Sequence, residues 1–224
     1  MTLRVFVTGT GTDVGKTFVS RALAMALCAQ EERVVAIKPL ETGCAPDPAD
    51  AIALAEACGR PDLAHLDGLY RRPPPLAPLA ATLSGEQPFD WRKVRAAMRP
   101  HLDESNVIIE GAGGLLVPVD AQRTMADLAM DLGLPLVVVA VDGLGVLSHV
   151  LTTLESAAQR HLPVAAVILR EASPGGEDDP SIASNIDILT ARSDAPVLRF
   201  PYVTSDYELT EAGGVLLTRM RRAR

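Results

Sequence analysis

Hydrophobic residues gather in short continuous runs, and longer stretches with a helical alternation of apolar and polar positions separate these runs. Short Val/Ile/Leu-rich runs are typical of strands that are buried on both faces. They predict strands at residues 3–9, 33–39, 106–114, 135–142, 163–170 and 195–200. The stretches between them predict helices at residues 16–30, 50–58, 91–102, 125–132, 146–161 and 181–191.

Strands that alternate with helices in this way predict an α/β fold with a mostly parallel central sheet of about seven strands and helices on both faces. A length of 224 residues fits a single domain, so we expect residues 1–224 to form one unit. Residues 70–91 are rich in proline and predict a long irregular loop over the carboxyl edge of the sheet. Two interpretations of this loop stay open: a spacer, or a wall of a pocket at that edge.

Composition narrows the possible partners. Apolar residues make up 48% of the chain and charged residues 22%, and the net charge is −7, which argues against a nucleic-acid partner. The basic run at 219–224 predicts a solvated tail. Met1 stands almost directly before the first predicted strand, which leaves no room for a signal peptide, and no apolar run reaches the ~18 residues of a membrane helix. The 3 cysteines fit a reducing compartment, so we expect a cytoplasmic protein without a membrane partner.

The stretch VFVTGTGTDVGKTF at 5–18 leads from the first predicted strand into the first predicted helix. Glycines allow the backbone N–H groups of such a turn to converge on phosphate oxygens, and the helix N-terminus favours the same anion. Lys16 can reach the β- and γ-phosphates, and the hydroxyl of Thr17 can bind Mg²⁺. The stretch therefore predicts a P-loop for a nucleoside triphosphate, with the nucleotide-binding residues Gly11, Thr12, Asp13, Val14, Gly15, Lys16, Thr17 and Phe18.

Charged residues also stand at other strand ends, and parallel strand ends meet at one crevice. Lys38 ends the second predicted strand and is either a solvated terminus or a second cation beside the phosphates. Glu110 follows a buried run, where P-loop enzymes keep a carboxylate that organises the metal. Asp50 begins a predicted helix, so it is either a plain N-cap or part of the metal shell.

Taken together, these motifs resemble the dethiobiotin synthetase family. GTGTDVGKT at 9–17 matches the family P-loop, and KPLETG at 38–43 is similar to its K-P-x-x-[ST]-G. DAIAL at 50–54 and VIIEGAGGLLVP at 107–118 match its D-A-x-x-L and V-E-G-A-G-G segments. GLGVLSHVLTTLES at 143–156 is similar to the L-G-x-x-N-H-x-x-L-T helix start of the family.

The resemblance implies a P-loop NTPase fold and a ring closure that depends on ATP and Mg²⁺. The substrates would be 7,8-diaminononanoate and CO₂, and the product would be dethiobiotin, which is used in biotin synthesis. The reaction would pass through an N-carbamate and a carbamic-phosphoric anhydride, with no protein nucleophile. The resemblance also implies a homodimer in which the partner completes each substrate site.

The matching motifs assign roles residue by residue. Lys16 and Lys38 would be catalytic, and Thr17, Asp50 and Glu110 would hold Mg²⁺. Asp13 would lie near the amino end of the substrate or the waters of the metal. The substrate-binding residues would be Thr12, Lys38, Thr42, Glu110, Gly111, Gly114 and Ser148, and Arg170 and Pro201 would border the nucleotide base.

Three positions depart from the family pattern. Ser148 stands where the family has the asparagine of its helix start, at the place that receives the substrate carboxylate. Arg170 and Glu171 stand where many members have Asn-Asp, and that asparagine reads adenine. A guanidinium has only donors, so the sequence predicts relaxed selectivity for the nucleotide base.

Two other functions remain as alternatives. A partition- or nitrogenase-reductase-like ATPase switch carries a signature lysine at the position that Gly11 occupies here, which argues against it. An amidoligase of the cobyrinic acid diamide synthase type needs a glutaminase domain, for which we expect no room in a chain that ends at Arg224.

Overall fold

The buried runs form one parallel sheet in the computed structural model, which describes residues 2–174 and 179–222. The sheet has 6 strands in the order β2-β5-β1-β6-β7-β8, and every pairing is parallel. The expectation of a mostly parallel sheet is thus confirmed, with six strands where the sequence predicts about seven. The strands are β1 (Arg4–Gly9), β2 (Val34–Ile37), β5 (Asn106–Gly114), β6 (Leu136–Val141), β7 (Val164–Arg170) and β8 (Val197–Phe200).

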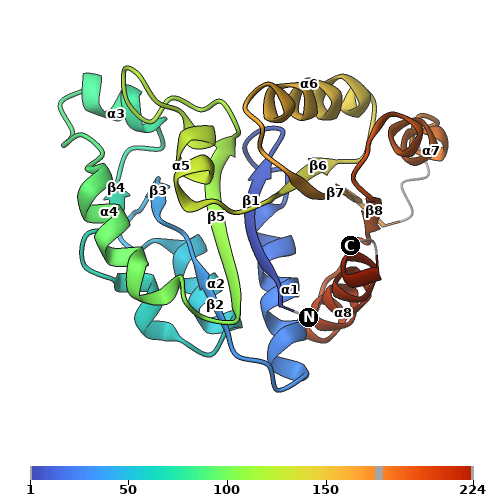
Figure 1. The fold of residues 1–224 in the computed structure, drawn as a ribbon, viewed down its shortest axis with the longest axis horizontal. Helices are drawn as coiled ribbons and strands as arrows, with labels where there is room; N and C mark the ends of the chain where they lie inside the picture. The colour runs from blue at the N-terminus through green and yellow to red at the C-terminus, as the bar shows by residue number, and fades with distance from the viewer. Residues whose placement is uncertain (1, 175–178, 223–224) are drawn as a thin grey trace.

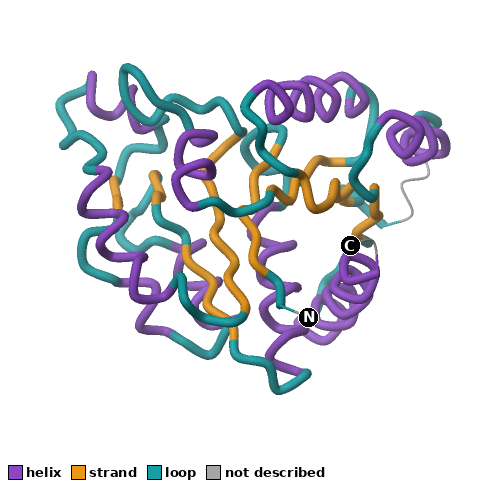
Figure 2. Tube along the Cα trace, viewed as in Figure 1, coloured by secondary structure: helices purple, strands orange, loops and turns teal. Residues whose placement is uncertain are grey.

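Helices cover both faces of this sheet (Figure 1). One face carries α1 (Lys16–Ala29), α2 (Ala49–Ala57) and α8 (Asp206–Arg222), with α1 packed against both α2 and α8. The other face carries α5 (Met125–Leu132), α6 (Val146–Gln159) and α7 (Ile182–Arg192), and α4 (Trp91–Met98) lies beside α5. Figure 2 shows the same layering, with the orange strands between purple helices.

The core lies in the middle strands, as the continuous apolar runs predict. Val5, Phe6 and Val7 of β1 are fully buried, as are residues 136–140 of β6. A strand with helices on both sides has no face for polar residues until its carboxyl end. The polar side chains that follow the strands therefore gather at that one edge.

Part of the proline-rich segment is regular, so the expectation of a wholly irregular loop at 70–91 is wrong. β4 (Tyr70–Arg72) pairs in parallel with β3 (Leu40–Thr42), and these strands form a second, 2-stranded sheet. α3 (Pro78–Leu83) follows, and its proline stands in the first turn, where the missing N–H costs no helical hydrogen bond. Short 3₁₀ turns occur at η1 (Pro61–His65) and η2 (Arg99–His101).

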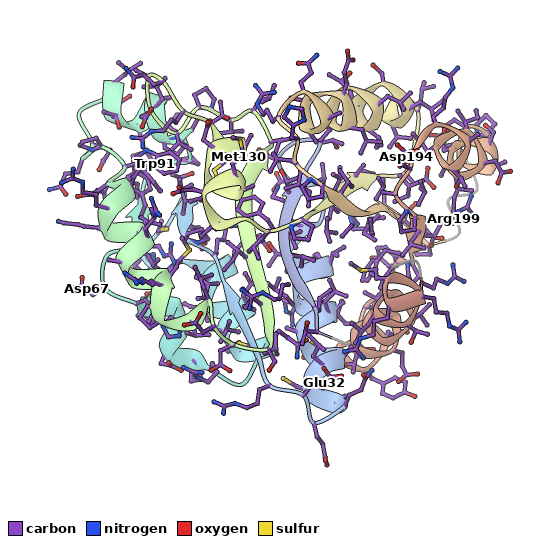
Figure 3. All side chains as sticks on the ribbon, viewed as in Figure 1. Glu32, Asp67, Trp91, Met130, Asp194 and Arg199 are labelled. Carbon is purple, nitrogen blue, oxygen red and sulfur yellow. The ribbon has the colours of Figure 1, made fainter. Side chains whose placement is uncertain are left out.

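The basic run at the C-terminus is not a solvated tail in its described part. Residues 219–222 form the last turn of α8, and Met220 is buried. Arg221 donates to the carboxylate of Glu32 at 2.7 Å, which ties α8 to the turn between α1 and β2, where Figure 3 labels Glu32. Residues 223–224 of this run lie outside the described residues.

Within the described ranges, every helix is too short or too polar to cross a membrane.

Candidate nucleotide and metal site

The P-loop closes tightly between β1 and α1. Gly15 has φ +95°, a conformation that L side chains rarely adopt, and it is the residue before the first turn of α1. A Cβ atom on Gly15 would stand 2.3 Å from Cδ of Arg170, so a side chain has no room there. The ammonium of Lys16 folds back over the loop and donates to the carbonyl oxygen of Gly11 at 2.9 Å. The ammonium of Lys16 is therefore held at the loop, where a phosphate bound by the loop N–H groups would meet a positive charge.

Strands β2 and β5 and the first turns of α1 and α2 bring the predicted polar residues together. Thr17 donates its hydroxyl hydrogen to Oε1 of Glu110 at 2.8 Å, and Nζ of Lys38 donates to the same oxygen at 2.9 Å. Lys38 also donates to Oδ2 of Asp50. Lys38 is therefore not a solvated strand terminus: its ammonium lies between two carboxylates and beside the P-loop.

The surroundings shift the pKa values of the two lysines of the site in opposite directions. Burial lowers the pKa of Lys16, and the nearby ammonium of Lys38 lowers it further, against the pull of Glu110. Burial also opposes the charge of Lys38, but Glu110 and Asp50 outweigh it and raise the pKa of Lys38. Lys38 is thus the more firmly held cation, and Lys16 is the one still short of negative partners. A phosphate group would supply them.

A cleft of about 600 Å³ opens over these residues. The P-loop and the ends of β2 and β5 form its floor, and residues 75–78 form a side wall, so the proline-rich loop does border a pocket. The side chain of Asp50 is 44% exposed, whereas those of Lys38 and Glu110 are 6% and 0% exposed. The lining residues are Thr12, Asp13, Gly15, Lys16, Thr17, Phe18, Lys38, Glu41, Thr42, Asp50, Pro75, Leu76, Ala77, Pro78, Ala112, Gly113 and Val117.

The donor set fits Mg²⁺. Oε2 of Glu110 is buried without a hydrogen-bond partner among the described residues, and a buried charged oxygen needs a cation or a donor. Thr17 and Asp50 add a hydroxyl and a second carboxylate, which are the hard oxygen ligands that Mg²⁺ uses together with phosphate oxygens. Across the described ranges, no three His, Cys, Asp or Glu side chains gather as a metal site of their own. A metal here would therefore depend on the hydroxyl of Thr17 and on the nucleotide.

Several predicted site residues lie away from this cleft. Gly111 is buried, and a Cβ atom on it would meet the ring of Phe6 at 2.9 Å. Gly114 lines a neighbouring hollow with Thr152 and Thr153 of α6. Ser148 (in α6), Pro201 (after β8) and Arg170 (at the end of β7) are not among the residues that line the cleft over Lys38.

Arg170 lies against the outside of the P-loop. Its Nε donates to the carbonyl oxygen of Val14 at 3.1 Å, and its Nη1 donates to that of Glu171 at 3.0 Å. The guanidinium is thus held by backbone carbonyls rather than by a carboxylate. It adds a positive charge next to the loop.

Sequence reasoning missed four residues of the cleft: Glu41, Ala112, Gly113 and Val117. Ala112 and Gly113 belong to the glycine-rich end of β5, where the need for close approach was a usable signal. Gly113 has φ +62°, and a Cβ atom on it would stand 2.7 Å from Cγ2 of Val117. Glu41 carried no signal of its own, because its partners lie in a helix that begins later in the chain.

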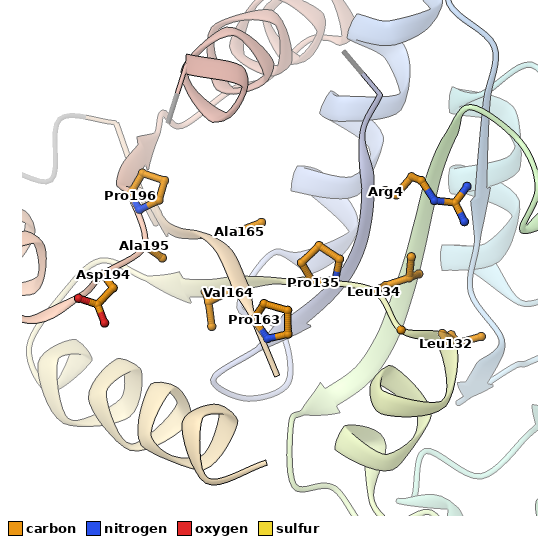
Figure 4. A pocket seen from close by; sticks show the side chains of 11 residues that line it. Arg4, Leu132, Leu134, Pro135, Pro163, Val164, Ala165, Asp194, Ala195 and Pro196 are labelled. Atoms are coloured by element: carbon orange, nitrogen blue, oxygen red, sulfur yellow. The ribbon is translucent and has the colours of Figure 1, made fainter. Parts of the chain in front are cut away.

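A second cavity, of about 580 Å³, lies at the opposite, amino-terminal edge of the sheet (Figure 4). Prolines 135, 163 and 196 line much of it, and its charged residues are Arg4 and Asp194. The guanidinium of Arg4 is occupied by the carbonyl oxygens of Leu102 and Glu104. This cavity brings together no set of groups comparable to the cleft over the P-loop.

The parallel sheet, the P-loop before α1 and the acidic residues at the neighbouring strand ends define the class of P-loop nucleoside triphosphatases. Solved structures agree on the fold. The structure of the protein ParA of pNOB8 bound to nonspecific DNA aligns with a TM-score of 0.59 at 11% identity over 100% of both chains. The hydrogenase maturation factor HypB from Archaeoglobus fulgidus aligns with a TM-score of 0.50 at 16% identity over 97% of this chain and 90% of that one.

Sequence comparison places the chain within this class. A family model described as an AAA domain matches residues 3–204. The ATP-dependent dethiobiotin synthetase BioD of Anaeromyxobacter dehalogenans strain 2CP-1 is 44% identical over 81% of each chain. The proteins of the same name from Caulobacter vibrioides strain NA1000 and Aeromonas hydrophila are 40% and 31% identical, over 84% and 91% of this chain and 86% and 92% of theirs. The chain belongs to the dethiobiotin synthetase family.

Proposed function

We propose that this protein is an ATP-dependent ligase that closes the ureido ring of dethiobiotin from 7,8-diaminononanoate and CO₂. The observation that carries the proposal is the position of Lys38, whose ammonium lies between Glu110 and Asp50 beside the P-loop. A partition- or reductase-like switch would carry its second lysine within the P-loop, at the position of Gly11, whereas here the second lysine follows strand β2. A second buried cation at this place favours a further anionic group that reacts with the γ-phosphate.

The chemistry uses three steps. One substrate amine adds to CO₂ and loses a proton, which gives a carbamate. A carbamate oxygen then attacks the γ-phosphorus, the bond to the bridging oxygen of ADP breaks, and a carbamic-phosphoric anhydride forms. The neighbouring amine attacks the anhydride carbon, loses a proton and expels phosphate as the ring closes.

Lys16 and Lys38 supply the positive charge that these steps need. Negative charge grows on the carbamate and phosphoryl oxygens, and preorganised donors in a partly buried site stabilise it. Thr12 and Thr42 border the same cleft and would orient the carbamate. Asp13 also lines the cleft, where it would meet the amino end of the substrate. No side chain has to form a covalent bond to the substrate.

Thr17, Asp50 and Glu110 would hold Mg²⁺, which when bound neutralises charge on the phosphates. Glu110 would have a second task besides binding Mg²⁺. Glu110 accepts hydrogen bonds from Thr17 and Lys38, so it also sets the position of the catalytic ammonium.

We also propose that residues 1–224 act as one catalytic domain and that two copies form a homodimer. Leu144 is 88% exposed in the loop before α6, close in sequence to Ser148, and neither residue faces the cleft of its own chain. In a homodimer, the exposed side chain of Leu144 and the start of α6, which is predicted to bind the substrate carboxylate, would contact the substrate of the partner. Because the reaction consumes ATP, we place it in the cytoplasm.

Mass spectrometry of the product tests the proposed activity. The protein is incubated with diaminononanoate, isotopically labelled bicarbonate, Mg²⁺ and ATP, and Lys16→Ala serves as the control with the largest expected loss of activity. We expect a product whose mass is that of diaminononanoate plus one labelled CO₂ minus one water, together with ADP and phosphate. ATP hydrolysis without this product would overturn the ligase assignment and favour a switch ATPase. Consumption of glutamine with a carboxylate substrate would favour an amidoligase.

A further inference from the structure

Glu41 is a buried carboxylate at the edge of the site, and the proposed reaction gives it no task. It lies in the middle of β3, is 7% exposed and borders the cleft over the P-loop. Its Oε1 accepts the backbone N–H of Asp50 at 3.0 Å, and its Oε2 accepts that of Ala51 at 2.9 Å. Both carboxylate oxygens thus bind the first turn of α2.

The start of α2 depends on this distant residue. The first N–H groups of a helix have no partner within the helix and usually bind a side chain at the residue before it. That residue is Pro48, which offers no side-chain hydrogen bond. Glu41 takes over the role from a separate strand, and its negative charge also suits the positive end of the helix.

The residue whose N–H binds Glu41 also contributes a carboxylate to the site. Asp50 gives its N–H to Glu41 and receives the ammonium of Lys38 on its side chain. The position of the Asp50 carboxylate is therefore set by strand β3, which lies against the start of α2. A shift at the start of α2 would move Asp50 away from Lys38 and from the place of the metal.

The neighbouring strand holds the other end of Lys38. In the register of the small sheet, Arg71 of β4 stands opposite Glu41 of β3. Nη2 of Arg71 donates to the backbone carbonyl oxygen of Lys38 at 2.8 Å. Burial lowers the pKa of Arg71, and the charge of Glu41 opposes that shift. The small β3–β4 sheet thus fixes the backbone of Lys38 through Arg71 and its carboxylate partner through Glu41.

We propose that Glu41 is a positioning residue for the metal site: it holds the Asp50 carboxylate where Mg²⁺ and Lys38 need it. This inference rests on the proposed role of Asp50 as a metal ligand. Groups that orient a metal ligand typically change metal affinity by about 10–100-fold when they are removed. Glu41 therefore acts on the affinity for Mg²⁺ through the position of Asp50.

The test measures how strongly the nucleotide complex depends on Mg²⁺. Calorimetric titration of a non-hydrolysable ATP analogue is run with and without Mg²⁺ on the full chain. For Glu41→Ala we expect the Mg²⁺-dependent gain in affinity to fall about tenfold or more, with Mg²⁺-free binding changed less than about threefold. Glu41→Gln keeps one acceptor oxygen and should lie between Glu41→Ala and the unchanged protein.

Asp90 provides a matched control. Its carboxylate also binds two N–H groups at a helix start, since as the N-cap of α4 its Oδ1 accepts from Arg92 and Lys93 at 3.0 and 3.1 Å. α4 contributes no residue to the cleft over the P-loop. Asp90→Ala should lower the melting temperature as a lost helix cap does and should leave the Mg²⁺ titration unchanged. An equal effect of both alanine variants on that titration would overturn the proposal.

A double-mutant cycle shows whether Glu41 acts through Asp50. In an Asp50→Ala background the ligand is gone, so adding Glu41→Ala should lower Mg²⁺ affinity no further. Independent, additive losses would contradict the proposed path. Should Glu41→Ala not fold, the same cycle is run with Glu41→Gln. Since the readout is binding rather than product, a failed ligase assay would remove the proposed activity and leave this inference standing.

Discussion

The two halves of the carboxyl edge are built differently. At the ends of β1, β2 and β5, which we name the phosphate half, charged side chains bind one another: Lys38 lies between Glu110 and Asp50, and Glu110 also binds Thr17. At the ends of β6, β7 and β8, the far half, Arg170 donates to main-chain carbonyls.

This difference determines how many neighbouring groups a substitution disturbs. Removing one member of the phosphate half leaves its partner as an uncompensated buried charge, which is costly and shifts the rest of the site. Removing Arg170 from the far half leaves main-chain carbonyls, which other donors or water can satisfy. We therefore expect large, coupled effects in the phosphate half and a small, local one at Arg170.

The largest effect is expected from Lys16→Ala. The change removes the cation that the P-loop holds for the transferring phosphoryl group, and loss of one preorganised donor at such a site costs about 10²–10³-fold in kcat. Because this donor is an ammonium and that figure describes the loss of a neutral amide donor, we expect turnover to fall at least by the upper figure. Steady-state release of phosphate and dethiobiotin measures it. Lys93→Ala, which removes an exposed lysine of α4, is the matched control and should keep full activity.

Lys38→Ala should follow, with a loss of about two orders of magnitude or more in kcat. The variant also leaves the carboxylate of Glu110 with the hydroxyl of Thr17 as its remaining donor, so the melting temperature should fall as well. A kcat within about threefold of the unchanged protein would mean that Lys38 serves the structure and not the reaction. The difference between the two halves would then rest on Lys16 alone.

Asp50→Ala should act mainly on the metal. We expect the Mg²⁺ concentration for half-maximal activity to rise about tenfold or more, while the melting temperature changes little, because Asp50 is the exposed member of the network. Asp47→Ala removes an exposed carboxylate from the loop just before α2 and serves as control. An unchanged Mg²⁺ titration in Asp50→Ala would mean that Asp50 does not bind the metal and serves only the start of α2.

The sequence predicts the charged residues of the phosphate half better than it predicts the residues that position them. Continuous apolar runs located all six strands of the central sheet, and parallel strand ends must converge, so Lys16, Lys38 and Glu110 could be placed together in advance. Glu41 and Arg71 could not. They act through β3 and β4, strands of only 3 residues each that have no periodic pattern, and through partners distant in the chain.

Helix α8 was missed for a related reason. Gly213 and Gly214 interrupt its sequence, and glycine disfavours the interior of a helix. In the structure Gly213 lies against α1, where a Cβ atom would stand 2.0 Å from the carbonyl oxygen of Ala22. The close packing of α8 on α1 therefore requires a glycine, although helix propensity disfavours glycine at that position. The same packing turns the C-terminal basic run into a helix end.

The smallest effect is expected at Arg170, in the far half, and it concerns the nucleotide base. The N6 amine of adenine is a donor, and a guanidinium offers only donors, so Arg170 cannot pair with it. Two of its N–H groups already bind the carbonyl oxygens of Val14 and Glu171, which keeps the side chain against the P-loop. A site that pairs the edge of a base rejects other bases strongly, because a mismatch leaves buried polar groups without partners. Here that pairing amide is missing.

We therefore expect ATP, CTP, GTP and UTP all to support turnover, with kcat/KM values within about a hundredfold of one another, since the P-loop binds the triphosphate whatever the base. Arg170→Asn introduces an amide that can both donate and accept, and it should raise the preference for ATP. Arg170→Ala separates the gain of the amide from the loss of the guanidinium and should leave selectivity low. A preference for ATP above about a hundredfold in the unchanged protein, some 2.7 kcal/mol, would show that backbone groups of the far half read the base. Fixed main-chain groups would then carry specificity there, just as ion pairs carry the chemistry at the phosphates.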